Sequence, residues 1–145
     1  MSEIFSHNNV SISDNDLGWK DAVRLCAKPL LEAGYIDESY LDSIFEMAEK
    51  LGPYFDFGQG IAVPHSRPQK GVKKTCAALL KLNKPVLLMD DPSHSIDIFV
   101  VFASVDDESH IEILQEIAGT FGEKSNIENI KNANTVEEIL EVFDN

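Results

Sequence analysis

The stretch Gly60-Ile61-Ala62-Val63-Pro64-His65-Ser66-Arg67 decides how this chain folds, because an apolar run in it stops at a proline. Residues 61–63 form a short apolar run between glycine and proline, a pattern typical of a buried strand. Pro64 has no backbone N–H to donate and its φ is fixed, so we expect the strand to end there. His65 therefore follows a strand directly, on a backbone position suited to carry a chemical group.

Helical and strand patterns alternate along the rest of the chain, which predicts an α/β domain. A weak strand signal covers residues 9–13, and clearer strands are expected over residues 75–82 and 96–103. The last of these is almost continuously apolar, as expected of a central strand that is covered on both faces. Residues 84–95 are rich in turn-forming residues and predict a connection between the two strands.

The first helical pattern follows Asp16, its expected cap, and ends near Gly34. Pro29 lies inside this pattern and is expected to kink or break the helix near Leu25. A second helix is expected to begin at Asp37 or Ser39. It shares with the first a stripe of apolar residues at helical spacing.

Glycine and proline at residues 52–53 end the second helix, and residues 53–58 predict a loop with three aromatic side chains. We expect these aromatics either to fold onto the core or to contact a partner. A third helix is expected over residues 108–121. The segment from Thr135 to Glu138 is a capping-box pattern that predicts a last helix at the C-terminus.

The overall composition fits one soluble globular domain spanning residues 1–145. The chain carries 25 acidic and 12 basic side chains, a formal net charge of −13, which argues against binding to nucleic acid or to an anionic membrane. Its N-terminus lacks the features of a signal peptide, and no apolar run approaches the length of a membrane span. We therefore expect a cytoplasmic protein.

Several enzyme classes are disfavoured by motifs that the sequence lacks. There is no histidine or cysteine pair at zinc-ligand spacing, no Ser-containing nucleophile elbow and no glycine-rich nucleotide loop. The two cysteines, Cys26 and Cys76, lie in apolar runs and are expected to be reduced core residues. Neither a metal nor a nucleotide cofactor is therefore predicted.

Two of the four histidines lie at the edges of regular elements, whereas His7 and His94 lie in polar segments and are interpreted as incidental. His65 follows a strand, and His110 falls in the first turn of the third helix. The first N–H groups of a helix are unpaired and carry partial positive charge, so they favour an anion nearby. If this helix packs beside the end of strand 61–63, a phosphoryl group on His65 would meet a donor from His110.

The segment Gly60 to His65 closely resembles the phosphorylation-site motif of EIIA proteins of the fructose/mannitol class, in the bacterial phosphoenolpyruvate-dependent sugar phosphotransferase system. The segment Ser109-His110-Ile111-Glu112-Ile113-Leu114 resembles the second histidine motif of that family. The spacing of the motifs and the order of the helices also agree, so the resemblance covers nearly the whole chain. It implies a mixed β-sheet flanked by helices on both sides.

Within this class, the chain is most similar to the ascorbate-type branch. The similarity rests on Gly52-Pro53-Tyr54-Phe55, on residues 64–68 and on residues 71–75. The mannitol-like branch has an arginine sixteen residues before the phosphorylated histidine, where this chain has Glu49. Arg67 is the substitute that we expect to bind the phosphoryl group, because a guanidinium suits its oxygens and lies close in sequence.

The resemblance implies a phosphocarrier mechanism with His65 as the acceptor. His65 would accept a phosphoryl group on Nε2 from phosphorylated HPr and pass it to a cysteine of a cognate EIIB, which serves the membrane component EIIC. His110 would orient or stabilise the phosphoryl group, and no cofactor or metal is required. An L-ascorbate-type uptake system is the favoured destination. The alternatives are an EIIA for fructose- or mannitol-like sugars, a regulatory module that binds targets according to the phosphorylation of His65, and a scaffold that has lost transfer.

Overall fold

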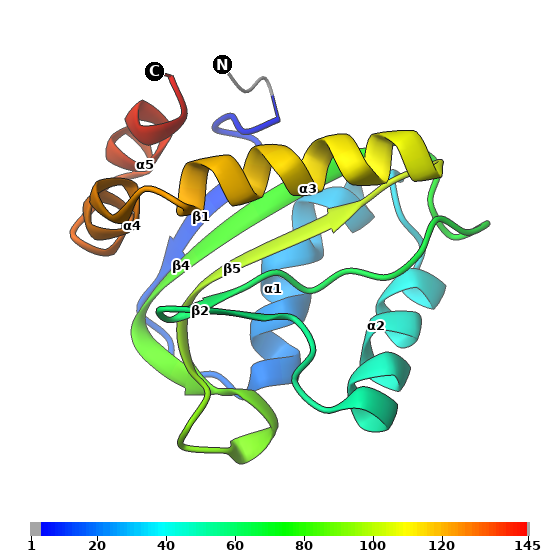
Figure 1. Ribbon diagram of the computed structural model, residues 1–145, viewed down its shortest axis with the longest axis horizontal. Helices are drawn as coiled ribbons and strands as arrows, with labels where there is room; N and C mark the ends of the chain where they lie inside the picture. The colour runs from blue at the N-terminus through cyan, green and yellow to red at the C-terminus, as the bar shows by residue number, and fades with distance from the viewer. Residues whose placement is uncertain (1–3, 145) are drawn as a thin grey trace.

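A five-stranded mixed β-sheet forms the centre of the computed structural model, which describes residues 4–144 (Figure 1). The strands are β1 (Val10–Ser13), β2 (Asp56–Gly58), β3 (Ile61–Ala62), β4 (Cys76–Leu87) and β5 (Ser95–Ala103), in the spatial order β1-β4-β5-β3-β2. The pairs β1/β4 and β3/β5 are parallel, whereas β4/β5 and β2/β3 are antiparallel. The predicted mixed-sheet α/β fold is thereby confirmed.

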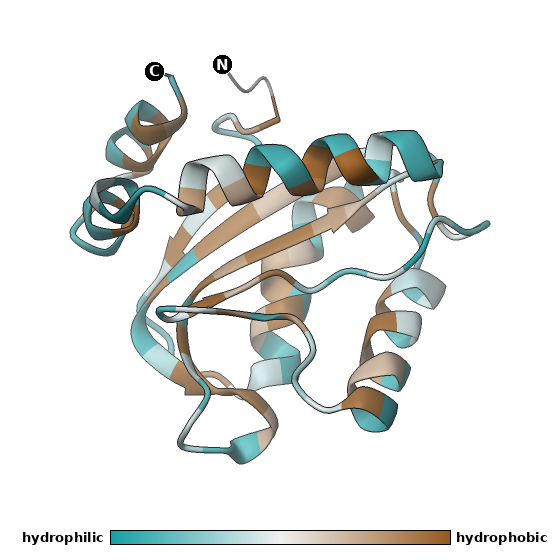
Figure 2. Ribbon diagram, in the orientation of Figure 1, coloured by the Kyte–Doolittle hydropathy of each residue, from teal (hydrophilic) through white to brown (hydrophobic). Residues whose placement is uncertain are grey.

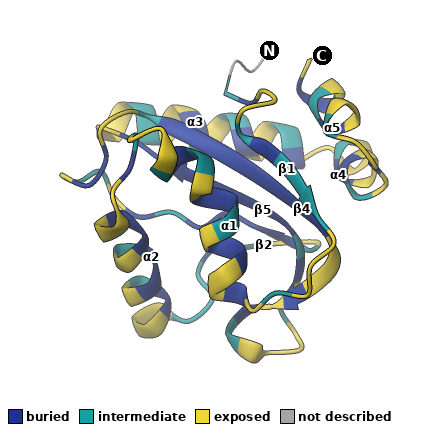
Figure 3. Cartoon of the chain, turned by 180° about the vertical axis from the view of Figure 1, so that it is seen from behind, coloured by how far each residue is buried: buried dark blue, intermediate teal, exposed yellow. Residues whose placement is uncertain are grey.

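Helices cover both faces of this sheet. On one face lie α1 (Trp19–Glu32) and α2 (Glu38–Leu51) (Figure 3). The other face is covered by α3 (Asp107–Phe121), α4 (Lys124–Lys131) and α5 (Val136–Phe143). Figure 2 shows largely apolar strands between helices that carry both apolar and polar residues along their length, as expected of helices with one buried side.

The central strand β5 builds a hydrophobic core on each face of the sheet. Successive side chains of a strand point to opposite faces. Val100 and Phe102 therefore join the cluster under α3 to α5, whereas Phe99 and Val101 join the cluster under α1 and α2. All four are fully buried, which explains why this strand reads as a continuous apolar run.

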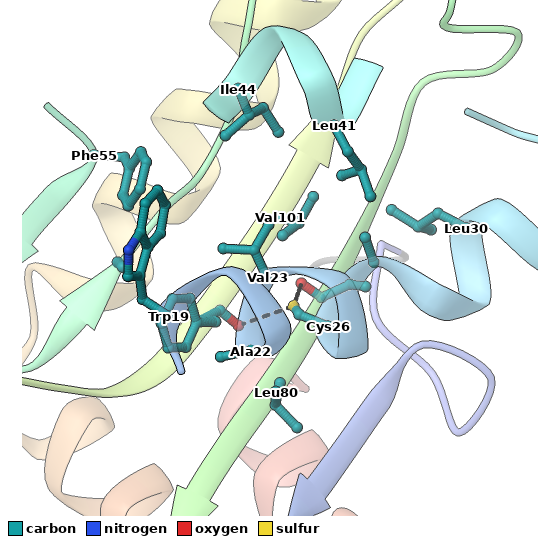
Figure 4. Packing of buried hydrophobic residues seen from close by; sticks show 14 of the residues in the cluster. Trp19, Ala22, Val23, Cys26, Leu30, Leu41, Ile44, Phe55, Leu80 and Val101 are labelled. Carbon is teal, nitrogen blue, oxygen red and sulfur yellow. Dashed lines mark hydrogen bonds between the residues drawn. The ribbon is translucent and has the colours of Figure 1, made fainter. Parts of the chain in front are cut away.

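Cys26 illustrates the packing under α1 (Figure 4). Its Sγ lies 3.4 Å from the carbonyl oxygen of Ala78 and 3.5 Å from that of Phe99, and burial raises the pKa of the thiol to about 12. Cys76 is also buried and free, and burial raises the pKa of its thiol to about 12 as well. Both cysteines are therefore poor nucleophiles at neutral pH.

The first helix differs from its prediction at its N-cap and at Pro29. Its N-cap is Gly18 and not Asp16, and the first turn is anchored by the buried Trp19. Pro29 does not break the helix, which continues to Glu32, because Pro29 lies in the last turn and few bonds depend on it. Gly34 follows the helix with φ +77°, as predicted for a glycine at a helix end.

Three further elements were wrong or missing in the prediction. Strand β4 continues to Leu87 through the segment interpreted as a connection, because Pro85 is exposed at an irregularity in the ladder and needs no donor there. The loop over residues 53–58 contains β2. Helix α4 was not predicted, since it has only eight residues and two buried isoleucines.

The turn between β2 and β3 explains the glycine that precedes the apolar run. Gln59 and Gly60 both have positive φ, at 58° and 84°, as primed hairpin turns require. A Cβ atom at Gly60 would lie 2.6 Å from Nζ of Lys131 and 2.8 Å from Oδ1 of Asp97. These two atoms form an ion pair at 3.0 Å, so the side chains already fill the space beside the turn.

Replacing Gly60 with alanine is expected to lower the free energy of unfolding by about 2–3 kcal/mol, from the strained φ and the displaced ion pair. Urea denaturation measures this loss. Gly34→Ala is the matched control, because it shares the positive φ but has no atom within 4 Å of the added Cβ. It is expected to cost about 1 kcal/mol. Equal losses at both sites would contradict a steric role for the pair of Lys131 and Asp97.

Candidate functional site

The backbone around His65 is fixed by the end of the short strand β3. After Ala62, the N–H of Val63 donates to the carbonyl oxygen of Phe55 at 2.8 Å, and Pro64 is buried. Nδ1 of His65 lies 2.7 Å from the carbonyl oxygen of Val63. Because a carbonyl oxygen only accepts hydrogen bonds, Nδ1 must carry the proton in this contact. Nε2 of the neutral ring is therefore left with its lone pair.

Aromatic rings hold the imidazole of His65 in a half-buried position. The ring stacks on Phe102, with centroids 4.7 Å apart and planes 18° from parallel. The ring of Tyr54 packs edge-on at 5.9 Å, and its hydroxyl donates to the carbonyl oxygen of His65. Burial, together with the nearby His110, lowers the pKa of His65, although the bond to Val63 opposes this shift. His65 is thus neutral and ready to act as a nucleophile near neutral pH.

A buried tyrosine fixes the segment that follows His65. The hydroxyl of Tyr40 accepts a hydrogen bond from the N–H of Ser66 at 2.9 Å and donates to the carbonyl oxygen of Phe102 at 2.7 Å. Tyr40 is fully buried, and burial raises the pKa of its hydroxyl. The tyrosine therefore ties the strand that carries Phe102 to the residue after His65. Sequence patterns showed Tyr40 only as part of the apolar stripe of α2.

His110 lies beside His65, so the condition that the sequence left open, packing of the third helix beside the end of strand 61–63, is met. The two ring centroids are 5.4 Å apart, and both rings contact Phe102. The N-cap of α3 is Asp106, whose side chain accepts from the N–H and the hydroxyl of Ser109 at 2.8 Å. These bonds fix the helix start and lower the pKa of Asp106. The structure thus brings together the two predicted histidines, one from each of the two sequence motifs.

Hydrogen bonds from the neighbouring strand anchor the start of α3. The hydroxyl of Thr75 donates to the hydroxyl of Ser109 at 3.1 Å and accepts from the N–H of Val105 at 3.1 Å. The hydroxyl oxygen of Ser104 lies 3.3 Å from Nδ1 of His110. Thr75 and Ser109 entered the sequence interpretation only as members of motif segments, and Ser104 was not singled out. A serine or threonine in a short polar segment carries no pattern that points to a histidine.

The predicted phosphoryl-binding cation, Arg67, is exposed two residues after His65. In the part of the chain that the structure describes, its guanidinium makes no hydrogen bond or ion pair. Glu49 lies on α2 and pairs with Lys20 across 3.9 Å on the surface. Glu49 therefore does not supply the positive charge that an arginine at this position would bring. The role of Arg67 stays a prediction.

The aromatic loop is only partly folded onto the core, and its contact with a partner stays a prediction. Phe55 is buried and packs against Trp19 and Tyr54, whereas Phe57 is 42% exposed. His94, interpreted as incidental, lies 2.5 Å from the carboxylate of Asp56 through Nδ1. That contact ties the β4–β5 connection to β2.

The two histidines do not line the cleft that lies beside α1 and α3. A cleft of about 800 Å³ opens between the N-terminal segment, the end of α1 and α3, and neither imidazole lines it. His65 is only partly buried, whereas a small-molecule site encloses most of its ligand. Within residues 4–144, no cluster of acidic, histidine or cysteine side chains could hold a metal ion. No helix of that range is long and apolar enough to cross a bilayer.

The lowered pKa of His65 predicts how acid affects stability. The usual pKa of a histidine is 6.5, and between that value and the folded-state pKa the unfolded chain binds a proton that the folded chain does not. Acidification through this window is therefore expected to destabilise the fold, whereas above pH 6.5 His65 contributes no pH dependence. An NMR titration of the imidazole protons measures the folded-state pKa. A midpoint for His65 at or above 6.5 would contradict the burial argument.

Comparison with known proteins places this geometry in a family. Residues 3–145 match the model of the phosphoenolpyruvate-dependent sugar phosphotransferase system, EIIA 2. The ascorbate-specific PTS system EIIA component of Shigella boydii is 34% identical over 127 residues, which cover 87% of this chain and 82% of that protein.

Two solved structures share the fold. The mannitol-specific cryptic phosphotransferase enzyme IIA CmtB of Escherichia coli superposes with a TM-score of 0.88 at 25% identity, covering 97% of this chain and 95% of that one. Enzyme IIA-Mtl of Escherichia coli, solved in complex with phosphorylated enzyme IIB-Mtl, gives 0.82 at 22% identity, covering 95% of each chain. That second likeness establishes the fold alone. Together with the match to residues 3–145, these findings show that the chain belongs to the EIIA type-2 family of the sugar phosphotransferase system.

Proposed function

We propose that this phosphocarrier accepts a phosphoryl group from phospho-HPr on Nε2 of His65 and passes it to a cysteine of a cognate EIIB. The observation that carries the proposal is the bond from Nδ1 of His65 to the carbonyl oxygen of Val63, which leaves the Nε2 lone pair free in a half-buried ring. The E. coli enzyme IIA that was solved with phosphorylated enzyme IIB supports an EIIB partner.

The transfer moves one phosphoryl group without a net proton change. The Nε2 lone pair forms a bond to phosphorus while the N–P bond of the donor phosphohistidine breaks, and that electron pair returns to the donor imidazole. A thiolate of EIIB then forms an S–P bond as the bond to His65 breaks. Both steps depend on in-line positioning and on compensation of the oxygen charge.

Two side chains are proposed to compensate the phosphoryl charge. His110, 5.4 Å away between ring centroids, donates a hydrogen bond to a phosphoryl oxygen. Arg67 lies two residues beyond His65, and its exposed guanidinium makes no ion pair among the described residues, so it is free to turn toward a phosphoryl group.

The proposed uptake system is of the L-ascorbate type, with EIIB linking this chain to the membrane component EIIC. The support is the relative from Shigella boydii, which is named as ascorbate-specific. No membrane insertion and no nucleic-acid contact belong to this proposal. The formal net charge of −13 suits an encounter with basic protein surfaces.

The test is a phosphotransfer assay with phosphoenolpyruvate, enzyme I, HPr and a panel of EIIB proteins. The chain is expected to gain one acid-labile phosphoryl group by mass spectrometry and to pass it fastest to an ascorbate-type EIIB. Faster transfer to a mannitol- or fructose-type EIIB would overturn the sugar assignment alone. Uptake without transfer to any EIIB would favour a regulatory switch, and absence of uptake would overturn the carrier proposal.

A further inference from the structure

Ser104 is a buried hydroxyl that contacts the second histidine. It follows β5 directly and is 0% exposed, and its Oγ lies 3.3 Å from Nδ1 of His110. Within residues 4–144, Nδ1 is the one hydrogen-bond partner of this hydroxyl. Since a buried hydroxyl proton is costly to leave without an acceptor, the identity of that partner decides where the protons lie.

The proton count between these two groups favours one arrangement of the neutral ring. If Nδ1 of His110 carried the proton, the hydroxyl of Ser104 would accept it and its own proton would find no acceptor among the described residues. If Ser104 donates to Nδ1, the buried hydroxyl is satisfied and the ring proton lies on Nε2. Donation by Ser104 thus leaves Nε2–H of His110 available to a group outside the core.

We propose that Ser104 is a positioning residue that keeps the proton of neutral His110 on Nε2, the tautomer opposite to that of His65. The inference rests on the proposed function for its purpose, because an Nε2–H group is what a phosphoryl oxygen on the neighbouring ring needs. The carbonyl of Val63 forces Nδ1–H on His65 and leaves a lone pair to attack phosphorus. The hydroxyl of Ser104 forces Nε2–H on His110 and supplies a donor.

A hydroxyl suits this role better than a carbonyl or a carboxylate. A carbonyl in its place would only accept and would leave the neutral ring with a lone pair facing the phosphoryl oxygens.

NMR of the unphosphorylated chain tests the assignment directly. At alkaline pH, where imidazoles are neutral, long-range ¹⁵N–¹H spectra distinguish the two tautomers. We expect His65 to be protonated on Nδ1 and His110 on Nε2. The signals that disappear in the His110→Gln variant are those of His110. A His110 ring protonated on Nδ1 overturns the proposal, whether or not the chain accepts a phosphoryl group. Failure to accept a phosphoryl group overturns the proposed function and leaves this spectrum unchanged.

Variants then connect the tautomer to transfer. Ser104→Ala is expected to give His110 a mixture of tautomers and to slow phosphoryl uptake about fivefold, the size of one neutral hydrogen bond. Ser104→Thr keeps the hydroxyl and is expected to retain both the tautomer and the rate. Cys26→Ala removes one buried atom far from any contact with either imidazole and is expected to change neither. Slower uptake by Ser104→Ala with an unchanged His110 spectrum would mean a merely structural role and would overturn the proposal.

Discussion

Replacing His65 with glutamine is expected to abolish phosphoryl uptake, by more than about a thousandfold, because the proposed mechanism forms the covalent intermediate on Nε2 of His65. Glutamine keeps a side-chain amide that can donate to the carbonyl oxygen of Val63, so the fold should survive. Nε2 of His65 is the nitrogen whose lone pair the structure leaves free. Mass spectrometry after incubation with phosphoenolpyruvate, enzyme I and HPr measures the bound phosphoryl group.

Graded variants separate the acceptor from its helpers. His110→Gln is expected to slow uptake about a hundredfold, as loss of a transition-state donor does, and Arg67→Gln about tenfold. His7→Gln is the histidine control, since the ring of His7 lies on the surface and pairs there with the carboxylate of Glu137 at 3.3 Å. It is expected to take up phosphoryl groups at the unchanged rate. An acid-labile phosphoryl group on His65→Gln would place the acceptor elsewhere.

The predictable elements are those whose residues have uniform surroundings or act through their own local chemistry. β5 is covered on both faces by fully buried side chains, so its apolar run could be interpreted without knowing its neighbours. Pro64 ends a strand for reasons internal to proline. In contrast, Pro85 lies within β4, and nothing local indicates that an irregular, exposed part of the ladder will accept it. Tertiary packing decides such cases.

The candidate site divides in the same way. His65 and His110 could be found because each lies at the edge of a regular element, and the approach of their rings to 5.4 Å confirms that these edges meet. The groups that control the rings could not be found. The carbonyl of Val63 has no sequence signature, and Ser104 reaches His110 only because β5 delivers it beside the start of α3. Arg67 lies near His65 in sequence, but the structure gives its guanidinium no contact that would define its role.

Tyr40→Phe is expected to be the most destabilising conservative substitution near the site. Phenylalanine fills the same space, so the loss comes from the hydroxyl alone. Without it, the N–H of Ser66 and the carbonyl oxygen of Phe102 lose their bonds at 2.9 and 2.7 Å inside the protein. Each of the two buried groups left without a partner costs about 1–3 kcal/mol, which predicts a loss of about 2–6 kcal/mol in the free energy of unfolding.

Urea denaturation measures that loss, with Tyr35→Phe as the matched control. The ring of Tyr35 lies under Nζ of Lys74 at 4.7 Å, and its hydroxyl makes no hydrogen bond in the described part of the chain. The control is therefore expected to change stability by less than about 0.5 kcal/mol. Equal midpoints for Tyr40→Phe and the wild type would show that water or a shifted backbone replaces the hydroxyl.

The same variant reports on the link between fold and chemistry. Tyr40 joins Phe102, on which the imidazole of His65 stacks, to the residue that follows His65. Loss of this tie frees the ring to sample orientations in which Nε2 is not in line with the donor, and misplacement of this kind slows transfer steeply. Without urea, and at a temperature where the variant is fully folded, the rate of phosphoryl uptake is expected to fall about tenfold. An unchanged rate in a destabilised variant would mean that Phe102 and Val63 alone hold the ring, and that Tyr40 serves only the core.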